Sequence, residues 1–382
     1  MNKMDYDSSL ARQSRLAPGF LKTMQQTMTE EKLVSTLPLK ELWDAQQIII
    51  TGCGDSWLAG IAAKPVFESV AKMDVKVMRN IEFTRYLGSK MLGYSPNTPL
   101  VIAISISGNV SRVVEAVMRA KHYGANTILI TNNPNSAAAK EARYVLPLEM
   151  PQGEYQPGGN SYIASTFALM QLALRFARAK NTVSPLELDA MQKGFGAYAD
   201  AWAAALPEME DRAFELAKTW KDLRAYDFIG DYAEYATAFF GSAKVLECFG
   251  GYTSYDDSED WCHINYFLRE PETIGRVAIT NSDTPSFGRM KETLKAVEQL
   301  GSPCMVVTDA GKGEFASSFQ VFTTPKAPFF WMAPLLQHIP FDYVAGYMGR
   351  MKGVEDFRHD VPVFELLNKA PHRLTQSQIE II

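Results

Sequence analysis

The strongest constraint on the fold is a set of apolar runs that each end in small polar residues. In the first half of the chain these runs are QIIITGCGDS (47–56), VKVMRNIEF (75–83), PLVIAISISGN (99–109) and TILITNNPNS (127–136). Between them lie longer segments with apolar residues three and four apart, such as SRVVEAVMRAKHYGA (111–125). Strands that are apolar throughout are buried on both faces, and helices between them supply the crossovers of a parallel sheet. The sequence therefore predicts an α/β fold.

The second half of the chain repeats this layout. The stretch AYDFIGDYAEYATAFFGSAKVLECFG (225–250) predicts a strand, a short loop and a helix. Two further apolar runs, GRVAITNSDTP (275–285) and SPCMVVTDAGKG (302–313), again end in polar loops. A chain of 382 residues exceeds one usual hydrophobic core. We therefore expect two similar α/β units in tandem, although the residues of the two halves share little identity.

The boundaries of these parts follow from the same patterns. The long helical stretch SYIASTFALMQLALRFARAK (161–180) closes the first unit. The helix after SISGN is expected to be capped by Asn109 or Ser111 and to end near Gly124. We expect an N-terminal helical segment (1–30), a first domain (31–182), a helical connection (183–222), a second domain (223–350) and a C-terminal tail near the active site (351–382).

Composition narrows the class of protein. The net charge is −5, with acidic and basic residues interspersed, so no basic stripe offers a footprint for nucleic acid. The N-terminal residues lack the apolar core of a signal peptide, and no apolar run is long enough for a membrane span. These features lead us to expect a cytoplasmic protein. The 4 cysteines are widely spaced without a CxxC pair, so we expect neither a disulfide framework nor a zinc site.

Two polar loops carry the strongest chemical signal. Ligands of parallel α/β sheets bind at the carboxyl ends of the strands, and free N–H groups at the start of the next helix favour an anion. SISGN places Ser105 and Ser107, with Ser111 close behind, in one such loop, and TGCGDS supplies Gly54 and Ser56 in another. Together they indicate a phosphate site without a P-loop lysine. The alternative is that serine and glycine are ordinary turn residues here. Neither loop fits GxGxxG, so we expect no dinucleotide site.

The order GCGDS, SISGN and YIASTFAL (162–169) resembles the sugar isomerase (SIS) domain family. In tandem form the chain resembles the isomerase half of glucosamine-6-phosphate synthase and the fructosamine-6-phosphate deglycases, over residues 30–360. The resemblance implies two tandem SIS domains, each a parallel sheet flanked by helices in a flavodoxin-like three-layer sandwich. It also implies that Ser56, Ser105 and Ser107 bind phosphate, and that Ile163 and Ser165 contact the sugar.

The second half extends the resemblance. In the family, a helix that carries a glutamate base is followed sixteen residues later by a histidine that opens the sugar ring. The helix from Tyr235 matches without a gap and places Lys244 and Glu247 on family positions, and His263 lies sixteen residues beyond Glu247. A glutamate suits proton transfer between C1 and C2 of an open-chain sugar, and a histidine suits protonation of the ring oxygen. The alternative is a solvated helix glutamate and a packed or exposed loop histidine. Glu259 and Asp260 are interpreted as loop and helix-start carboxylates, with Asp260 nearest a family acidic position.

Several positions depart from the family pattern. Asp55 replaces a threonine beside the proposed phosphate, and could cap the helix or meet a cation, an amine or a sugar hydroxyl. In SISGN and just after it, Ile106, Asn109 and Val110 replace glutamine, glutamate and threonine, and Ser111 could substitute one position later. His263 is followed by Ile264 and Asn265 in place of Gly-Pro, and the family's C-terminal lysine has no clear counterpart, since Lys369 lies several residues late.

We therefore expect a phosphosugar isomerase or deglycase that acts on a ketose or amino-sugar phosphate of the fructosamine 6-phosphate type. The catalytic residues would be Glu247 and His263, and no metal or organic cofactor is needed. No glutaminase activity is expected. The resemblance implies a homodimer, in which His263 could serve the neighbouring subunit's site. The alternative function is a non-catalytic phosphosugar sensor, which would keep the serines and lose the Glu–His pair. The expected substrate-binding residues are Gly54, Asp55, Ser56, Ser105, Ser107, Asn109, Ser111, Ile163, Ser165 and Lys244.

Overall fold

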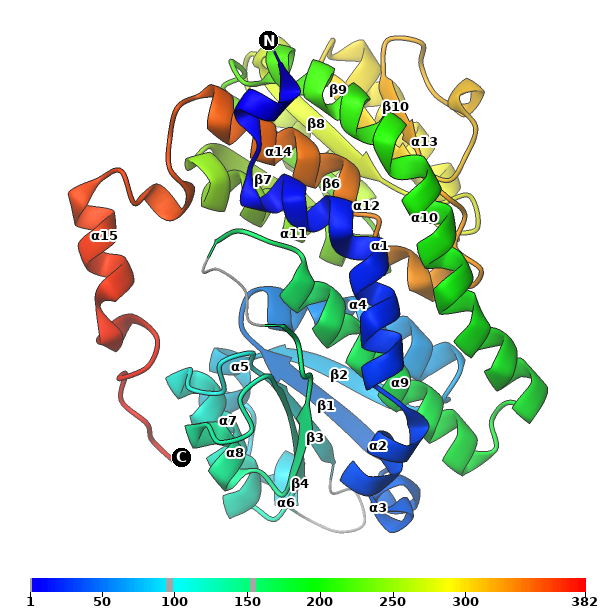
Figure 1. The fold of residues 1–382 in the computed structure, drawn as a ribbon, viewed down its shortest axis with the longest axis vertical. Helices are drawn as coiled ribbons and strands as arrows, with labels where there is room; N and C mark the ends of the chain where they lie inside the picture. The colour runs from blue at the N-terminus through cyan, green and yellow to red at the C-terminus, as the bar shows by residue number, and fades with distance from the viewer. Residues whose placement is uncertain (1, 94–98, 152–155) are drawn as a thin grey trace. The chain divides into compact units, whose positions relative to one another are not determined.

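A computed structural model describes residues 2–93, 99–151 and 156–382 (Figure 1). The chain divides into two compact units that interleave along the sequence. The first-sheet unit consists of Leu21–Gly153, Ser161–Lys193 and Leu366–Ile382. The second-sheet unit consists of Met1–Phe20, Glu154–Asn160 and Gly194–Glu365. The last residues of the chain thus group with the sheet that is formed first along the sequence.

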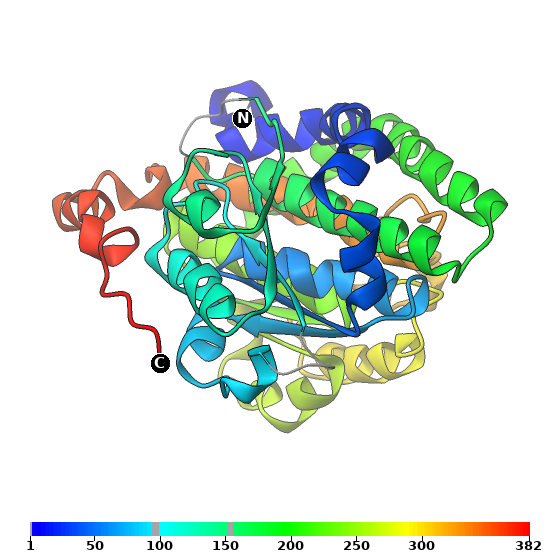
Figure 2. The same cartoon turned by 90° about the horizontal axis from the view of Figure 1, so that it is seen from below.

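The first-sheet unit is built on a parallel sheet of five strands in the order β2-β1-β3-β4-β5. Its strands are β1 (Gln47–Gly52), β2 (Asp74–Arg79), β3 (Leu100–Ile104), β4 (Asn126–Thr131) and β5 (Tyr144–Pro147). The helices are α2 (Glu30–Thr36), α3 (Leu39–Asp44), α4 (Asp55–Ser69), α5 (Asn80–Arg85), α6 (Lys90–Gly93), α7 (Ser111–His122) and α8 (Ala137–Glu141). Figure 2 shows these strands and helices from below.

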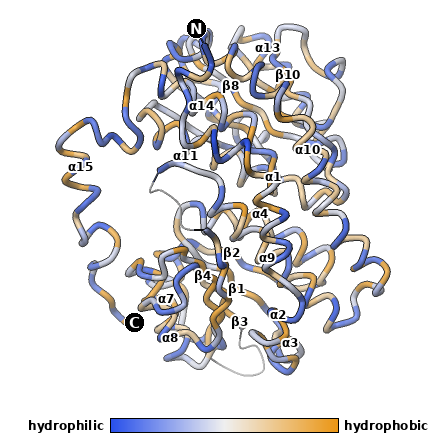
Figure 3. The backbone as a smooth tube through the Cα atoms, viewed as in Figure 1, coloured by the Kyte–Doolittle hydropathy of each residue, from blue (hydrophilic) through white to orange (hydrophobic). Residues whose placement is uncertain are grey.

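Both faces of this sheet are covered, which is why its central strand β3 is apolar and buried at every position. Ile49 and Val101 point to one face, where they pack with residues of α5 and α7. Ile50 points to the other face, where a Cβ on Gly60 of α4 would lie 2.9 Å from its side chain. Successive side chains of a strand alternate between faces, so both sets must be apolar. Figure 3 shows the resulting hydrophobic colouring along these strands.

The second-sheet unit has the same architecture, with strand order β10-β9-β8-β6-β7 and parallel pairing throughout. Its strands are β6 (Ala225–Gly230), β7 (Tyr252–Asp256), β8 (Ile274–Ile279), β9 (Cys304–Thr308) and β10 (Gln320–Thr323). Its helices include α11 (Ala233–Phe249), α12 (Ser258–His263), α13 (Phe287–Gln299) and α14 (Ile339–Met351). The remaining helices of the chain are α1 (Ser9–Thr27), α9 (Asn160–Lys180), α10 (Pro185–Trp220) and α15 (Pro362–Lys369).

The two sheets repeat one another down to the backbone of a single turn. β1 and β6 both have six residues and both end in glycine, at Gly52 and Gly230. Two residues later the N-cap of the following helix has a positive φ, 54° at Gly54 and 52° at Tyr232. Glycine adopts this conformation freely, whereas a tyrosine there is strained. The equivalent of Ser56, four residues after the terminal glycine, is Glu234 in the second sheet.

The predicted tandem α/β architecture is confirmed, and so are the helices expected after SISGN and at residues 161–180. The predicted cap of α7 is wrong. Its N-cap is Val110, which offers no side-chain hydrogen bond, so neither Asn109 nor Ser111 occupies the cap position. An acceptor from the C-terminal segment replaces the missing cap, as described below. Among the described residues, no helix is long and apolar enough to cross a membrane.

Candidate functional site

The turn from β1 into α4 brings the backbone close to itself. A Cβ on Gly52 would lie 2.9 Å from the Cβ of Ser56, so the turn requires glycine at this position. Asp55 and Ser56 are the first two residues of α4, and both are partly exposed. At this helix start the Ser56 N–H donates to the Cys53 carbonyl at 3.1 Å. The turn therefore presents Ser56 and a helix N-terminus at the carboxyl edge of the sheet.

Asp55 is not the cap of α4, because Gly54 occupies that position. Its carboxylate lies in the first turn, where interaction with the helix dipole stabilises a helix by about 0.3–1 kcal/mol. This accounts for an acidic residue in the turn without reference to a ligand. It also places a negative charge next to Ser56, so an anion bound there would have to be held by enough donors to offset that charge.

The loop after β3 is braced by its own serines. The Ser105 hydroxyl oxygen accepts from the Gly108 N–H at 3.1 Å, and the Ser107 hydroxyl oxygen accepts from the Asn109 N–H at 3.3 Å. Gly108 has a φ of 64°, and a Cβ there would overlap the Ser136 hydroxyl. A serine that accepts one hydrogen bond still has its own proton to donate. Both hydroxyls are thus fixed in position with a donor left for a ligand, with Ser105 buried and Ser107 exposed.

The Asn109 side chain forms a contact within the protein. Its side-chain oxygen accepts from the N–H of Ala137, the first residue of α8, at 3.1 Å. The carboxamide thereby ties the loop after β3 to the start of a neighbouring helix. Asn109, which stands where the family has a glutamate, therefore has a structural contact in this chain.

Ser111 is engaged by the C-terminal segment, residues 374–382. Its N–H, at the start of α7, donates to the Leu374 carbonyl at 2.8 Å. Its hydroxyl oxygen accepts from the Ser377 N–H at 3.2 Å, and the side chain is buried. The Leu374 carbonyl thus accepts the hydrogen bond from the start of α7, for which the sequence predicts a side chain of Asn109 or Ser111 as the cap. In this arrangement the chain itself occupies the N-terminus of α7.

Charged residues of α5 and α7 hold the C-terminal segment. Glu380 pairs with Arg85 at 2.9 Å, and Arg85 also pairs with the buried Glu115 at 2.8 Å. Arg119 Nε donates to the Ile382 carbonyl at 2.8 Å. Lys369, which lies several residues after the position of the family's lysine, is exposed at the end of α15, before this segment begins.

Ile163 and Ser165 lie in α9 and are fully buried. The Ser165 hydroxyl has no hydrogen-bond partner in the described part of the chain. A buried hydroxyl without a partner costs about 1–3 kcal/mol, so such groups are usually satisfied by a water or a ligand. The Ser165 hydroxyl therefore has a hydrogen bond left to make, whereas Ile163 offers only its backbone and apolar side chain.

In the second-sheet unit, the proposed base Glu247 forms an ion pair with Lys244 one turn earlier on α11. Lys244 Nζ lies 2.8 Å from Glu247 Oε2 and 4.2 Å from the centre of the Phe240 ring. The lysine is buried with 1% of its side chain exposed, whereas 27% of the glutamate side chain is exposed. The ammonium group stabilises the carboxylate form of Glu247, the form that a base requires. The sequence had assigned Lys244 to the substrate, and its observed contact is with Glu247.

His263 ends α12 and pairs with Glu259 on the same helix. His263 Nε2 lies 3.1 Å from Glu259 Oε1, and Glu259 Oε2 accepts from Arg289 Nε at 2.6 Å. The hydrogen bond from His263, followed by that from Arg289, holds the pKa of Glu259 below its ordinary value. The sequence alone indicates only a loop or helix-start carboxylate at Glu259. The i, i+4 spacing of the two residues is the signal that could have revealed the pair.

Three carboxylates beside this helix have the proximity of metal ligands, since Asp256, Asp257 and Asp260 offer oxygens within 4.8 Å of one another. Asp257 has a structural role, because it accepts from the N–H groups of Glu259 and Asp260 at 2.9 and 2.8 Å and caps α12. A helix cap explains why an aspartate stands there. We assign no metal to this cluster.

Glu234, the positional equivalent of Ser56, is buried and hydrogen-bonded. Its Oε1 accepts from Asn281 Nδ2 at 2.8 Å and from the Thr284 hydroxyl at 3.1 Å. Burial raises the pKa of Glu234 to about 7. The turn after β6 therefore carries an acidic group where the turn after β1 carries a hydroxyl.

Comparison with known proteins identifies the first half. The family model described as the SIS domain matches residues 41–175, which include both loops of the first sheet. Residues 41–175 form a SIS domain. The matched range contains Ser56, Ser105 and Ser107, and the repeat of the sheet order shows that the second half has the same α/β fold.

Relatives extend the match beyond this SIS domain. A glutamine–fructose-6-phosphate aminotransferase (isomerizing) of Clostridium tetani is 26% identical over 322 residues, which is 81% of this chain and 50% of the relative. A Bacillus cereus enzyme of the same name is 26% identical over 309 residues, 80% of this chain and 48% of the relative. The chain thus spans about half the length of these relatives and is homologous to their isomerase half.

Solved structures share the tandem SIS fold. The C-terminal domain of a glucosamine–fructose-6-phosphate aminotransferase from Francisella tularensis has a TM-score of 0.82 at 18% identity, over 90% of this chain and 96% of that one. Tagatose-6-phosphate ketose/aldose isomerase from Escherichia coli has a TM-score of 0.72 at 16% identity, over 92% and 96%. The chain therefore shares the tandem SIS fold of these structures.

Proposed function

We propose that the protein is a phosphosugar isomerase or deglycase that acts on a ketose or amino-sugar phosphate of the fructosamine 6-phosphate type. The observation that carries the proposal is the Glu247–Lys244 ion pair at 2.8 Å. A sensor needs only to bind, whereas this arrangement sets a partly exposed carboxylate beside a buried lysine. Similarity to the named aminotransferases and to the tagatose-6-phosphate isomerase adds support.

In the proposed reaction, Glu247 removes a proton from the carbon next to the carbonyl of the open-chain sugar. The resulting enediol, or enaminol where C1 bears an amine, is reprotonated at the neighbouring carbon by the same carboxyl group. His263 donates a proton to the ring oxygen when the ring opens. In the deglycase variant, water then adds at C1, the amine leaves, and an aldose phosphate remains. Ser56, Ser105 and Ser107 would donate hydrogen bonds to the phosphate.

Proton exchange with solvent tests this chemistry directly. In D₂O, the wild type should replace the C1 or C2 proton of its substrate with deuterium, as followed by ¹H NMR with fructose 6-phosphate, glucosamine 6-phosphate and fructosamine 6-phosphates. Glu247→Gln should abolish the exchange and keep the affinity, while Glu298→Gln, at an exposed position on α13, should behave as the wild type.

The second candidate function, a non-catalytic phosphosugar sensor, is favoured by one observation: the chain itself occupies the N-terminus of α7. A sensor would bind one of these sugar phosphates without any exchange in D₂O. Binding without exchange by the wild type would therefore replace the enzyme proposal with the sensor.

We also propose a homodimer in which His263 serves the neighbouring subunit's site. Mixing inactive Glu247→Gln and His263→Asn chains should then restore activity, because one of the two sites in a mixed dimer would contain both intact residues. A mixture that stays inactive while sedimentation shows exchange of subunits would place both residues of one site in the same chain.

A further inference from the structure

A buried carboxylate in the middle of the second sheet holds the segment that carries His263. Asp227 lies on β6 and is fully buried. Its register partners on the two neighbouring strands are Ser254 on β7 and Arg276 on β8. Both partners donate to it, the Ser254 hydroxyl to Oδ1 and an Arg276 guanidinium N–H to Oδ2. The three side chains form a polar row across an otherwise apolar sheet.

Two further donors reach this row from outside the sheet. The Trp261 indole N–H donates to Asp227 Oδ2 at 2.6 Å, and the Asn265 amide donates to Oδ1 at 2.9 Å. A carboxylate has about four acceptor positions, so Asp227 is fully satisfied by these donors and those of Ser254 and Arg276. The carboxylate thus joins three strands of the sheet to α12 and to the turn of 3₁₀ helix after it.

Trp261 and Asn265, the two donors from outside the sheet, flank His263 in the sequence. They lie two residues before and two residues after His263 and are buried, at 0% and 9% exposure. Between them His263 and Ile264 face outward, with 67% of the His263 side chain and 62% of Ile264 exposed. The segment is thus fixed at two points that both end on one carboxylate. The residue pair Ile264-Asn265, which departs from the family's Gly-Pro, supplies the second of these points.

Stability alone does not account for this arrangement. Replacing a buried ion pair by apolar residues of similar volume is often neutral or stabilising, because desolvation offsets the Coulombic gain. Here the Arg276 Nε and Nη2 groups have no hydrogen-bond partner in the described part of the chain, which adds to that cost. A carboxylate that accepts four directional hydrogen bonds does, however, fix the position of every donor.

We propose that Asp227 and Asn265 are positioning residues for His263. The proposal rests on the proposed function, in which His263 delivers a proton to the sugar ring. Asp227 acts through Asn265 and Trp261 to hold the backbone of residues 261–265, and Glu259 then orients the imidazole. A small displacement of His263 would leave substrate affinity unchanged and slow the proton transfer.

Asn265→Ala and Ser254→Ala form a matched pair for the test. Each removes one hydrogen-bond donor to Asp227 Oδ1, so both should lower the melting temperature by a similar small amount. Only Asn265→Ala should lower kcat, by about 10- to 100-fold with KM within about twofold, because displacing a catalytic group by about 1 Å has an effect of this size. Asn265→Gln, which keeps a side-chain amide, should restore part of kcat.

Hydrogen exchange provides a readout that does not depend on activity. The amides of residues 258–267 should exchange faster in Asn265→Ala than in Ser254→Ala or the wild type. Equal exchange in the two variants, or an equal fall in kcat, would overturn the positioning role. If the wild type turns over no sugar phosphate, the proposed function fails, and the exchange measurement still decides whether Asn265 holds the His263 segment.

Discussion

The imidazole Nε2 of His263 lies 3.1 Å from Oε1 of Glu259, one helical turn earlier on α12. Because a carboxylate that accepts from one ring nitrogen fixes the orientation and tautomer of a histidine, we expect Glu259→Gln to lower kcat by about tenfold, a part of the 10²–10⁴-fold that general acid–base catalysis contributes. Steady-state kinetics on the accepted sugar phosphate would measure this. KM and the melting temperature should change little, since the Glu259 side chain is 60% exposed.

The matched control for this prediction is Glu292→Gln. Glu292 is also exposed and also pairs with Arg289, at 3.2 Å, but makes no contact with His263. A fall in kcat of the same size in both variants would mean that charge near Arg289 matters and that the orientation of His263 does not.

Lys244→Met tests the ion pair on α11. Methionine has a similar length and keeps the apolar contact with Phe240, so the buried site stays filled. The substitution removes only the ammonium group beside Glu247. We expect kcat to fall by about 10- to 100-fold, because a shift in general-base protonation and position removes much of a 10²–10⁴-fold contribution. Lys295→Met, at an exposed position on α13, should have no effect on kcat. Unchanged kcat in Lys244→Met would show that Glu247 does not depend on the lysine.

The serines of the first sheet should separate into two functional groups. Ser107 is exposed, and Ser107→Ala should weaken the binding of inorganic phosphate by about tenfold, since a hydrogen bond to a charged group contributes about 1.5–3 kcal/mol. Ser111 is buried and bonded to Leu374 and Ser377, so Ser111→Ala should leave phosphate affinity within about threefold. It should instead make residues 374–382 more sensitive to protease. Titration calorimetry and limited proteolysis would measure the two effects, and weaker phosphate binding by Ser111→Ala would assign its hydroxyl to the ligand.

Glu234 should make stability depend on pH in the direction opposite to most carboxylates. Burial raises its pKa from 4.5 to about 7, so between these values the folded protein binds a proton that the unfolded chain has released. Stability contributed by the protonated group is therefore present below pH 4.5 and is lost as the pH rises through 7. The loss should be on the order of 3 kcal/mol. Urea unfolding at pH 5 and pH 8 would show this, and Glu234→Gln should remove most of the difference.

Glu298→Gln serves as the control for that measurement, because Glu298 is an exposed residue of the same unit. Its unfolding should retain the wild-type dependence on pH. A wild type whose stability rises steadily from pH 5 to pH 8 would contradict the assignment, since it would mean that the Glu234 carboxylate is ionised in the folded protein throughout this range.

The sequence was informative wherever a pattern is local. Apolar strands that end in small polar residues or glycine, such as Gln47–Gly52, are typical of a parallel α/β sheet, and the two predicted α/β units rested on such strands. The capping of α7 could not be predicted in this way, because the acceptor comes from Leu374, more than 260 residues later. The same applies to Asn109, whose partner Ala137 lies in another helix. Contacts between distant segments depend on the tertiary fold, for which a single sequence holds no periodic signal.

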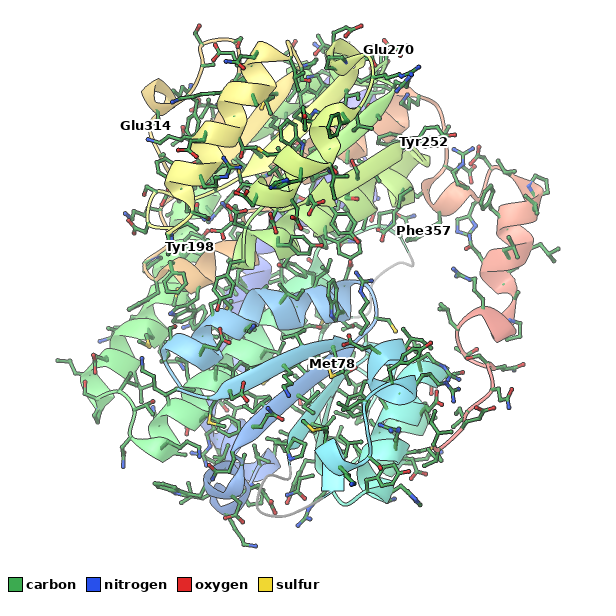
Figure 4. The ribbon with its side chains drawn as sticks, turned by 180° about the vertical axis from the view of Figure 1, so that it is seen from behind. Met78, Tyr198, Tyr252, Glu270, Glu314 and Phe357 are labelled. Carbon is green, nitrogen blue, oxygen red and sulfur yellow. The ribbon has the colours of Figure 1, made fainter. Side chains whose placement is uncertain are left out.

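The candidate site shows the same limit. The sixteen-residue interval between Glu247 and His263 was visible, but the buried Asp227 that anchors the histidine segment reads in the sequence as an acidic residue inside a strand. Only the register with Ser254 and Arg276 shows why it is tolerated. Phe357, labelled in Figure 4, is a further example. Its φ is 53°, a conformation that a sequence usually signals with glycine or asparagine and that a phenylalanine does not predict.

The paired turns at Gly54 and Tyr232 have a consequence for binding stoichiometry. Their backbones match, with φ values of 54° and 52°. Only the first turn carries a hydroxyl at this place, at Ser56, because the second carries Glu234, which is buried and accepts hydrogen bonds from Asn281 and Thr284. The repeated turn therefore carries its hydroxyl in the first sheet alone, and a titration with sugar phosphate should saturate at one equivalent per chain.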